Sequence, residues 1–205
     1  KIRNANSYSN AAQVRKHGGV PVLLGIARDD VDDLTARIRA GLAQDVDLFL
    51  SSGGVSMGEF DLVKDILTAE GAIDFWKVCM KPGKPLAFGH IGGVPFLGLP
   101  GNPVSVMVSF EMFVRPAMWR MLGRTDLTRP TRQATLMDEI AHKDQRRHYV
   151  RVHLEPVDGG YRAHLTGGQG SGILSSMVKA NGLAIIPEAW DRVPAGTQVR
   201  VIPLD

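Results

Sequence analysis

The residues best suited to chemistry lie in a glycine-rich stretch at 51–61, Ser-Ser-Gly-Gly-Val-Ser-Met-Gly-Glu-Phe-Asp. An apolar run precedes the stretch and a helical pattern follows it, so we predict a strand, a glycine turn and a helix N-terminus. Glycines let backbone N–H groups converge on an oxyanion, and a helix start adds partial positive charge. Asp61 adds a carboxylate suited to a metal ion. The stretch predicts an oxyanionic or phosphorylated ligand, although a plain strand-to-helix connection explains the glycines equally well.

A second group of chemical residues is the lysine-rich segment that begins at Lys77. Lys77, Cys79 and Lys81 alternate along a predicted strand, so their side chains project to one side. Neighbouring like charges are unfavourable unless water or an anion neutralises them. The stiff turn at 82–85 fixes the directions of Lys81 and Lys84. We favour an anion site over a solvated strand face, and we interpret Cys79 as a buried strand residue.

A third element that could bind an anion is the strand-to-helix turn at 98–105, which contains Pro100 and Asn102. Ordinary capping would also account for Asn102 and for a proline at the first helical position. Turns that follow strand ends converge on one crevice in an open α/β sheet. We therefore expect this turn, the glycine stretch and the lysines to share a site.

The acidic pair Asp29 and Asp30 also follows a predicted strand. Two carboxylates on adjacent strand ends suit Mg²⁺, which prefers oxygen ligands and bridges substrate phosphates. Capping of the next helix is the alternative, and for Asp29 we favour capping.

The elements that must position these residues fall into two regions, which differ in their predicted pattern of helices and strands. In residues 1–126, helical patterns alternate with short apolar runs, which indicates a layered α/β domain with a mainly parallel sheet. In residues 127–205, short strands and turns predict a small β-barrel or sandwich. The predicted helices cover 7–17, 31–42, 62–67 and 104–114, with one helical turn at 175–181; the predicted strands cover 20–26, 46–50, 73–79, 85–89, 94–98, 132–140, 148–156, 161–165, 182–187 and 197–203.

Composition excludes several classes of protein. The chain has 205 residues, a net charge of +3 and one cysteine, so a disulfide framework and a cysteine-cluster metal site are excluded. Long basic runs and apolar runs of membrane-spanning length are absent from the sequence, which argues against nucleic-acid and membrane partners. The first residues lack the layout of a secretory signal, so we expect a cytoplasmic protein.

These motifs, in this order, resemble the molybdopterin molybdotransferase (molybdenumtransferase) family, which includes the C-terminal domain of gephyrin. The resemblance rests on residues 25–30, 51–61, 75–85 and 98–105, and on the Gly-Gly-Gln-Gly-Ser-Gly run at 167–172 with the serines and Ala-Asn-Gly that follow it. It implies a three-layer molybdopterin-binding α/β domain followed by a C-terminal β-barrel. It also implies an enzyme of molybdenum cofactor biosynthesis that uses adenylylated molybdopterin and molybdate and releases AMP.

The resemblance assigns roles to individual residues. Asp30 and Asp61 are implied as ligands of Mg²⁺ or of the pyrophosphate site, and Lys77 and Lys81 as ligands of molybdate or phosphate. Together with Asp61, these two lysines are the implied catalytic residues. The residues implied to bind substrate are Gly53, Gly54, Ser56, Gly58, Lys84, Pro100 and Asn102, with Ser171 and Ser175 contributed by the barrel or by a partner subunit.

The chain also departs from the family pattern. The family's α/β domain normally opens with a strand and a Thr-Gly-Asp-Glu-type loop, and two further domains usually precede it. This chain starts downstream of them, so we expect a fragment whose sheet lacks its first strand. The helix predicted at 104–114 is apolar on more than one face, from which we predict a homodimer.

Two alternative functions stay open at the level of sequence. A molybdopterin adenylyltransferase shares the glycine turn, but it usually lacks a C-terminal β-domain and has a different loop after the paired glycines. A non-catalytic molybdopterin-binding or scaffold fragment is the alternative from another class.

Overall fold

The computed structural model describes residues 3–28, 30–54, 71–141 and 144–204. The chain divides into two compact units. The first comprises Lys1–Val78 and Gly83–Arg124, and the second comprises Cys79–Pro82 and Thr125–Asp205. The chain thus enters the second unit briefly at Cys79–Pro82 before returning to the first, which a single boundary at 126/127 does not anticipate.

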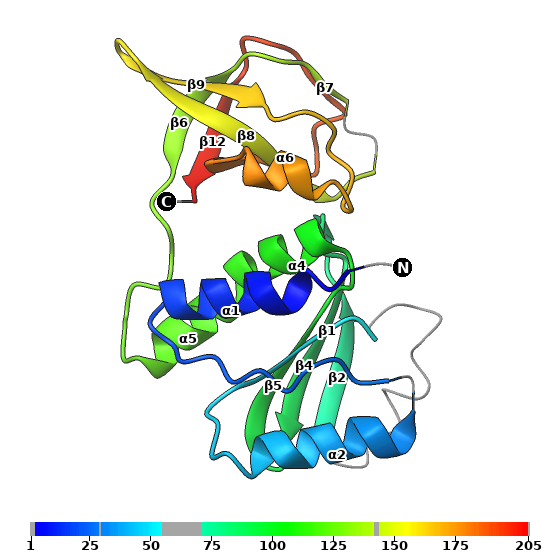
Figure 1. Cartoon of the computed structure of the whole chain (residues 1–205). Coiled ribbons are helices and arrows are strands. Elements are labelled where there is room, and N and C mark those ends of the chain that lie inside the picture. The colour runs from blue at the N-terminus through cyan, green and yellow to red at the C-terminus, as the bar shows by residue number, and fades with distance from the viewer. Residues whose placement is uncertain (1–2, 29, 55–70, 142–143, 205) are drawn as a thin grey trace. The chain divides into compact units, whose positions relative to one another are not determined.

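The first unit is built on a four-stranded sheet with the order β1-β5-β4-β2 (Figure 1). The strands are β1 (Phe49–Ser52), β2 (Gly71–Lys77), β4 (Pro85–Ile91) and β5 (Val94–Leu99). The β1–β5 pair is parallel, whereas β4 is antiparallel to both β5 and β2. The prediction of a mainly parallel sheet is therefore wrong for the described strands. The short turn at Gly92 and Gly93, both with positive φ, joins β4 to β5 as a hairpin, and a hairpin requires antiparallel neighbours.

Helices cover both faces of this sheet and confirm a three-layer α/β domain (Figure 1). The helix α2 (Val31–Leu42) packs Ile38 against Phe49 and Phe96 on one face. On the other face, Val106 and Phe110 pack against Leu97 and Leu99 of β5. They lie in a continuous helical stretch of α4 (Pro103–Ser109), the π-helix η1 (Phe110–Val114) and α5 (Arg115–Met121). Within the described residues, no helix combines the length and apolar character needed to cross a membrane.

The two-sided burial of this helical stretch is explained within the chain. The helix α1 (Asn6–Lys16) lies beside α4 (Figure 1), and the His17 ring stacks on Phe110 with centroids 6.0 Å apart. The stretch is therefore covered by the sheet on one side and by α1 on the other, so its apolar character is no argument for a subunit contact. The π-helix ends at Val114, two residues before Pro116, whose missing N–H interrupts the α-helical bonding.

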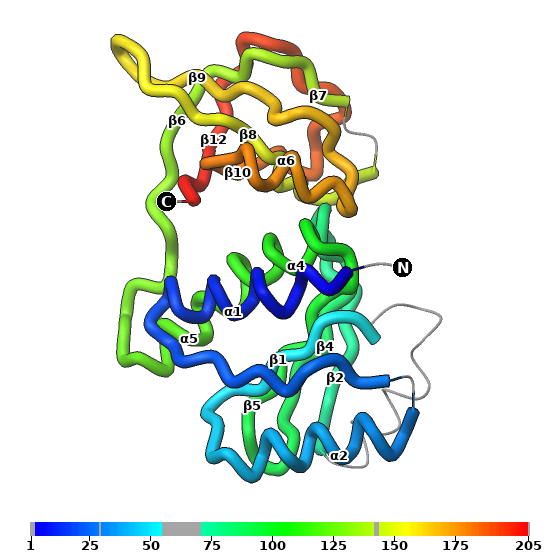
Figure 2. Tube along the Cα trace, viewed as in Figure 1, coloured from blue at the N-terminus to red at the C-terminus, as the bar shows by residue number. Residues whose placement is uncertain are grey.

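The strand predicted at 20–26 is not formed. This stretch is open chain between α1 and α2 (Figure 2), and the side chains of Val20, Leu23 and Ile26 are exposed. Arg37 of α2 fixes it by donating from Nη1 to the Leu24 carbonyl at 2.6 Å. Its apolar composition alone does not make a strand, because a strand also needs a neighbour whose backbone groups pair with its own.

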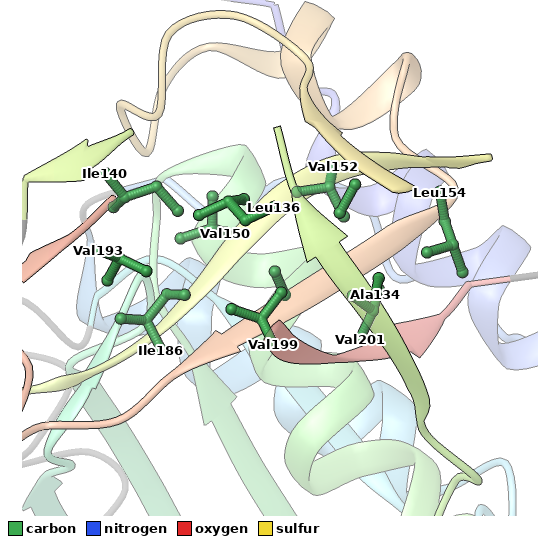
Figure 3. Close-up of a cluster of buried hydrophobic side chains, with 12 residues drawn as sticks. Ala134, Leu136, Ile140, Val150, Val152, Leu154, Ile186, Val193, Val199 and Val201 are labelled. Carbon is green, nitrogen blue, oxygen red and sulfur yellow. The ribbon is translucent and has the colours of Figure 1, made fainter. Parts of the chain in front are cut away.

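The second unit contains a closed five-stranded barrel, as predicted. Its strands pair in the order β10-β12-β6-β9-β8, and a further pairing of β10 with β8 closes the ring. Buried aliphatic side chains from these strands point into one core (Figure 3). The elements are β3 (Met80–Lys81), β6 (Arg132–Leu136), β7 (Ile140–Ala141), β8 (Arg147–Val157), β9 (Gly160–Leu165), α6 (Leu174–Val178), β10 (Gly182–Ile186), β11 (Arg192–Val193) and β12 (Gln198–Pro203).

Candidate functional site

The glycine turn after β1 and the turn after β5 lie side by side in the first unit. Parallel pairing sets Ser52 opposite Leu99, and the Gly53 N–H then donates to the Leu99 carbonyl at 3.1 Å. A Cβ built on Gly101 would lie 3.7 Å from the Gly53 Cα, so the two turns are in close contact. Gly53 and Gly54 both have positive φ, of 86° and 68°, which favours glycine over other residues. The structure thus brings together the first and third predicted anion-binding elements.

The turn after β5 leads directly into a helix. Asn102 is the N-cap residue of α4 in extended conformation, and Pro103 follows at the first helical position. The Asn102 side chain makes no capping hydrogen bond to this helix, so capping does not explain the choice of asparagine. The Asn6 side chain of α1 donates to the Gly101 carbonyl at 2.8 Å and holds the turn from the opposite side. The turn is therefore fixed by two helices and a strand.

Lys77 and Lys84 lie at the same end of this sheet. The strand β2 runs in the same direction as β1 and β5, so Lys77, its last residue, is at the end where Ser52 and Leu99 lie. Lys77 pairs with Pro85, and the Val78 N–H donates to the Lys84 carbonyl at 2.8 Å. This hydrogen bond closes the loop that connects β2 to β4. Both lysines are exposed. This end of the first unit therefore combines two cations with two turns that can present backbone N–H groups.

Lys81 does not continue the strand of Lys77, contrary to the prediction. The strand β2 ends at Lys77, and Lys81 belongs to β3, which pairs in parallel with β8 of the second unit. There its ammonium lies 3.0 Å from an Asp144 carboxylate oxygen. Cys79 is exposed rather than buried, and its thiol donates to the Gln145 carbonyl at 3.4 Å. Alternation along one strand is thus wrong for this segment, because its backbone pairs with a different sheet.

Asp30 has a clear structural role at the N-terminus of α2. One of its carboxylate oxygens accepts the Asp33 N–H at 2.9 Å, which is the expected N-cap bond. The other oxygen remains compatible with a metal ligand, since a carboxylate has two acceptor oxygens. The described residues include no group of three or more His, Cys, Asp or Glu side chains placed to hold a metal. Four other candidates fall outside the described residues: Asp29, Ser56, Gly58 and Asp61.

The barrel serines Ser171 and Ser175 follow a glycine-rich loop that is held by one buried arginine. Arg151 of β8 donates from Nη2 to the Gly168 and Gly170 carbonyls at 3.1 and 3.0 Å. Its Nε lies 3.1 Å from the Ser176 hydroxyl of α6. Ser175 is exposed and Ser171 is half-buried. The loop and the helix start that carry the two serines are therefore tied to one side chain.

Sequence reasoning missed Arg151. Its side chain is only 1% exposed, and burial lowers the pKa of Arg151. The alternation of β8 turns Val150, Val152 and Leu154 toward the barrel core and Arg151 outward, which predicts a solvated arginine. The loop at 167–170 covers it instead. The only signal in the sequence is the density of glycines in that loop, whose carbonyls lie open to a donor.

Comparisons with known proteins agree with this architecture. Residues 1–120 match the family described as "Probable molybdopterin binding domain", and residues 133–204 match "MoeA C-terminal region (domain IV)". The chain is 38% identical to molybdopterin molybdenumtransferase 2 of Mycobacterium tuberculosis, with 98% of this chain and 50% of that protein covered. It is 36% identical to the molybdopterin molybdenumtransferase of Nostoc sp., with coverages of 100% and 48%.

The solved structures agree as well. A molybdopterin biosynthesis MoeA protein from Pyrococcus horikosii superimposes with a TM-score of 0.82 and 29% sequence identity. The superposition covers 100% of this chain and 49% of that one. This chain thus spans about half the length of the relatives it matches.

Proposed function

Because this chain belongs to the family of molybdopterin-binding domains that continue into a MoeA C-terminal region, we propose that it acts in molybdenum cofactor biosynthesis. The proposed enzyme is a molybdopterin molybdenumtransferase. It takes adenylylated molybdopterin and molybdate as substrates and yields the molybdenum cofactor and AMP. The curated relatives named above carry that enzyme name, which supports the proposal.

The observation that carries the proposal is the convergence at one end of the first unit's sheet. The Gly53 turn, the turn at 100–102 and the side chain of Lys77 all lie at the ends of strands that run in one direction. Backbone N–H groups and ammonium groups are suitable partners for phosphate oxygens, and the positive charge compensates the anion. In this proposal Gly53 and Gly54, with Ser56 and Gly58, cradle the pterin or its phosphate. Pro100 and Asn102 form the opposite wall.

The lysines supply the charge that two anionic substrates require. Lys77 and Lys84 are exposed where the loop between β2 and β4 begins and ends, and an anion has access to both. Lys77 of the first unit and Lys81 of the second unit are each a proposed ligand of molybdate or phosphate. Ser171 and Ser175, on the loop and helix tied down by Arg151, are the proposed barrel contribution to substrate binding, from this chain or from a partner subunit.

Mg²⁺ fits the donor chemistry of the proposed site. Asp30 would hold it through the oxygen not used for capping, and Asp61 would be the second ligand. When bound, the ion would neutralise and polarise the pyrophosphate group of the substrate. The Asp30→Asn substitution separates this role from capping, because asparagine caps equally well but is a weaker Mg²⁺ ligand. We expect an increased Mg²⁺ requirement with an unchanged midpoint of thermal unfolding.

The decisive experiment measures AMP release by the protein at its full natural length, from adenylylated molybdopterin with Mg²⁺ and increasing molybdate. We expect molybdate to stimulate the release, and we expect Asp61→Ala to reduce it by at least about tenfold. No stimulation by molybdate, together with identical behaviour of Asp61→Ala, would refute the enzymatic proposal. Substrate binding without turnover would favour a scaffold, and AMP transfer from ATP to molybdopterin would favour an adenylyltransferase.

The homodimer remains part of the proposal, now without support from the helix at 104–114. The homodimer therefore stays a prediction. Analytical ultracentrifugation of the full-length protein tests it. A monomer at micromolar concentration would remove it.

A further inference from the structure

An ionic cluster in the second unit centres on the carboxylate of Asp144. The carboxylate lies 3.0 Å from the Lys81 ammonium, 2.6 Å from a guanidinium nitrogen of Arg146 and 2.7 Å from Nε2 of His148. The first contact comes from β3, and the other two come from the start of β8 and the residues before it. Three nitrogen donors, one from β3, one from β8 and one from the residue just before β8, thus converge on one side chain. Sequence reasoning assigned no role to Asp144.

The cluster is positively charged and partly shielded from water. The Asp144 side chain is 30% exposed and that of His148 is 9% exposed. Although desolvation raises it, hydrogen bonds from Arg146, His148 and Lys81 hold the pKa of Asp144 well below its usual range. Asp144 is therefore ionised at neutral pH. One carboxylate facing an ammonium and a guanidinium leaves a net positive charge, which an oxyanion can neutralise.

The backbone fixes where Lys81 starts, but not where its ammonium lies. Parallel pairing sets Met80 opposite Arg147 and Lys81 opposite His148, and the Arg147 N–H donates to the Cys79 carbonyl at 3.1 Å. A lysine side chain has four rotatable bonds and loses considerable entropy when it is held in one position. The contact with Asp144 is what selects one position for this half-exposed side chain.

We propose that Asp144 is a positioning residue, which holds the Lys81 ammonium in the place where it meets a tetrahedral oxyanion of the molybdate class. This inference rests on the proposed function, in which Lys81 is a molybdate ligand. An ammonium has three N–H donors, so a bond to Asp144 is compatible with a second bond to an incoming anion. His148 contacts the other carboxylate oxygen, Oδ1, and Arg146 shares Oδ2 with Lys81. These two contacts keep Asp144 from following Lys81 when the anion binds.

Positioning and simple electrostatics predict effects of opposite sign. Removing the carboxylate charge makes the cluster more positive, which by itself strengthens attraction of anions. Removing the contact releases Lys81 into many conformations, and the anion then has to order it on binding. If Asp144 positions Lys81, the second effect is the larger one. Weaker molybdate binding after removal of the carboxylate therefore indicates that Asp144 positions Lys81. Tighter binding indicates that the Asp144 carboxylate only competes with molybdate for the positive charge.

The test compares Asp144→Asn with Glu188→Gln in the full-length protein. Glu188 is a partly exposed carboxylate that pairs with the neighbouring Arg147 at 3.1 Å. The described ion pairs of Asp144 are with Lys81, Arg146 and His148. Two measurements are made, molybdate binding by equilibrium dialysis and the molybdate dependence of AMP release. For Asp144→Asn we expect Kd and KM for molybdate to rise about three- to fivefold, with kcat within about twofold. Glu188→Gln is expected to leave all three constants unchanged.

A double-mutant cycle with Lys81→Gln shows whether Asp144 acts through Lys81. Once Lys81 is replaced, Asp144→Asn is expected to have no further effect on molybdate binding. The conservative change Asp144→Glu keeps the charge and is expected to recover part of the affinity. It also replaces Asp144→Asn as the test variant if thermal unfolding shows that the asparagine variant is not folded, and in that case a rise in Kd of at least about twofold is expected.

The outcomes separate this inference from the proposed function. Unchanged or tighter molybdate binding by Asp144→Asn overturns the positioning role, as does an unchanged effect of Asp144→Asn in the absence of Lys81. If the unmodified protein binds no molybdate, the inference also fails. If it binds molybdate and loses affinity with Asp144→Asn but releases no AMP, the proposed function fails and the positioning role stands.

Discussion

At the scale of single residues, the ionised Asp144 makes a prediction about acid stability. Its pKa is lowered in the folded protein, whereas in the unfolded chain it is near the ordinary value of about 3.9. The stabilisation from its contacts is therefore complete above about pH 4 and is lost as pH falls below that value. We expect the free energy of unfolding to fall less steeply between about pH 4 and 2 in Asp144→Asn than in the unmodified protein.

Urea unfolding at a series of pH values measures this slope. Asp158→Asn is the matched control, because Asp158 is an exposed carboxylate in the turn between β8 and β9 where asparagine is equally suitable. The control is expected to retain the slope of the unmodified protein. Equal slopes for both variants would mean that the three contacts of Asp144 contribute nothing to folding.

Arg151 makes a second prediction at this scale. Replacing it with methionine keeps much of its volume but leaves the Gly168 and Gly170 carbonyls and the Ser176 hydroxyl without their donor. Buried acceptors that lose a partner are costly, so we expect Arg151→Met to lower the free energy of unfolding by about 2–4 kcal/mol. Arg162→Met, at an exposed position on β9, is expected to change it by less than about 0.5 kcal/mol. Similar losses for both variants in urea denaturation would contradict a special role for Arg151.

Single residues show clearly where sequence reasoning ends. The glycines at 53 and 54 were predictable because a turn with positive φ favours glycine. Arg151 was not, since its carbonyl partners lie 17 or more positions away in the chain. The Asp144 cluster was not either, since Lys81 reaches Asp144 from 63 positions away. The apolar character of Cys79 predicts a buried strand residue, but Cys79 lies between β2 and β3 and is exposed.

At the scale of elements, the pairing of β2 with β4 requires glycine where the backbones of the two strands approach closely. A Cβ on Gly89 would overlap the backbone carbonyl of Ala72, and backbone cannot move aside as a flexible side chain can. We expect Gly89→Ala to force the strands apart and to lower the free energy of unfolding by about 2–4 kcal/mol. Since Lys77 lies at the end of this strand pair, substrate binding should weaken as well.

Gly172→Ala is the control for this prediction, because a Cβ at that position has no neighbour within 4 Å. Guanidinium unfolding is expected to show a change below about 0.5 kcal/mol for the control. Equal stability of Gly89→Ala and the unmodified protein would show that the two strands can separate without cost.

Patterns that are local in sequence predicted the elements better than patterns that need a partner. The helix at 31–42 and the barrel hairpin through Gly159 follow from capping and turn residues within a few positions. The stretch at 20–26 has the composition of a strand, yet no described strand pairs with it. Conversely, β3 has only two residues, and it is a strand because β8 pairs with it.

At the scale of the whole molecule, the two regions of the sequence correspond to two compact units. The described strands form an open sheet in the first unit and a closed ring in the second. The barrel forms a complete ring through β10 and β8, and its core draws on β6, β8, β9, β10 and β12. The strand β3 lies outside this ring and meets β8 only at Arg147 and His148. The segment 79–82 therefore takes no part in the strand pairing that closes the ring, although it brings Lys81 to the Asp144 cluster.

From this closure we predict that residues 125–205 fold without the rest of the chain. A small barrel with one core should have a free energy of unfolding of about 3–5 kcal/mol, and its urea transition should be single and cooperative. Leu136→Ala is the internal control, because Leu136 is fully buried in that core and its truncation costs about 2–5 kcal/mol. That variant should be largely unfolded by circular dichroism and by amide chemical-shift dispersion. A fragment without a cooperative transition would show instead that the barrel needs β3 or the first unit to fold.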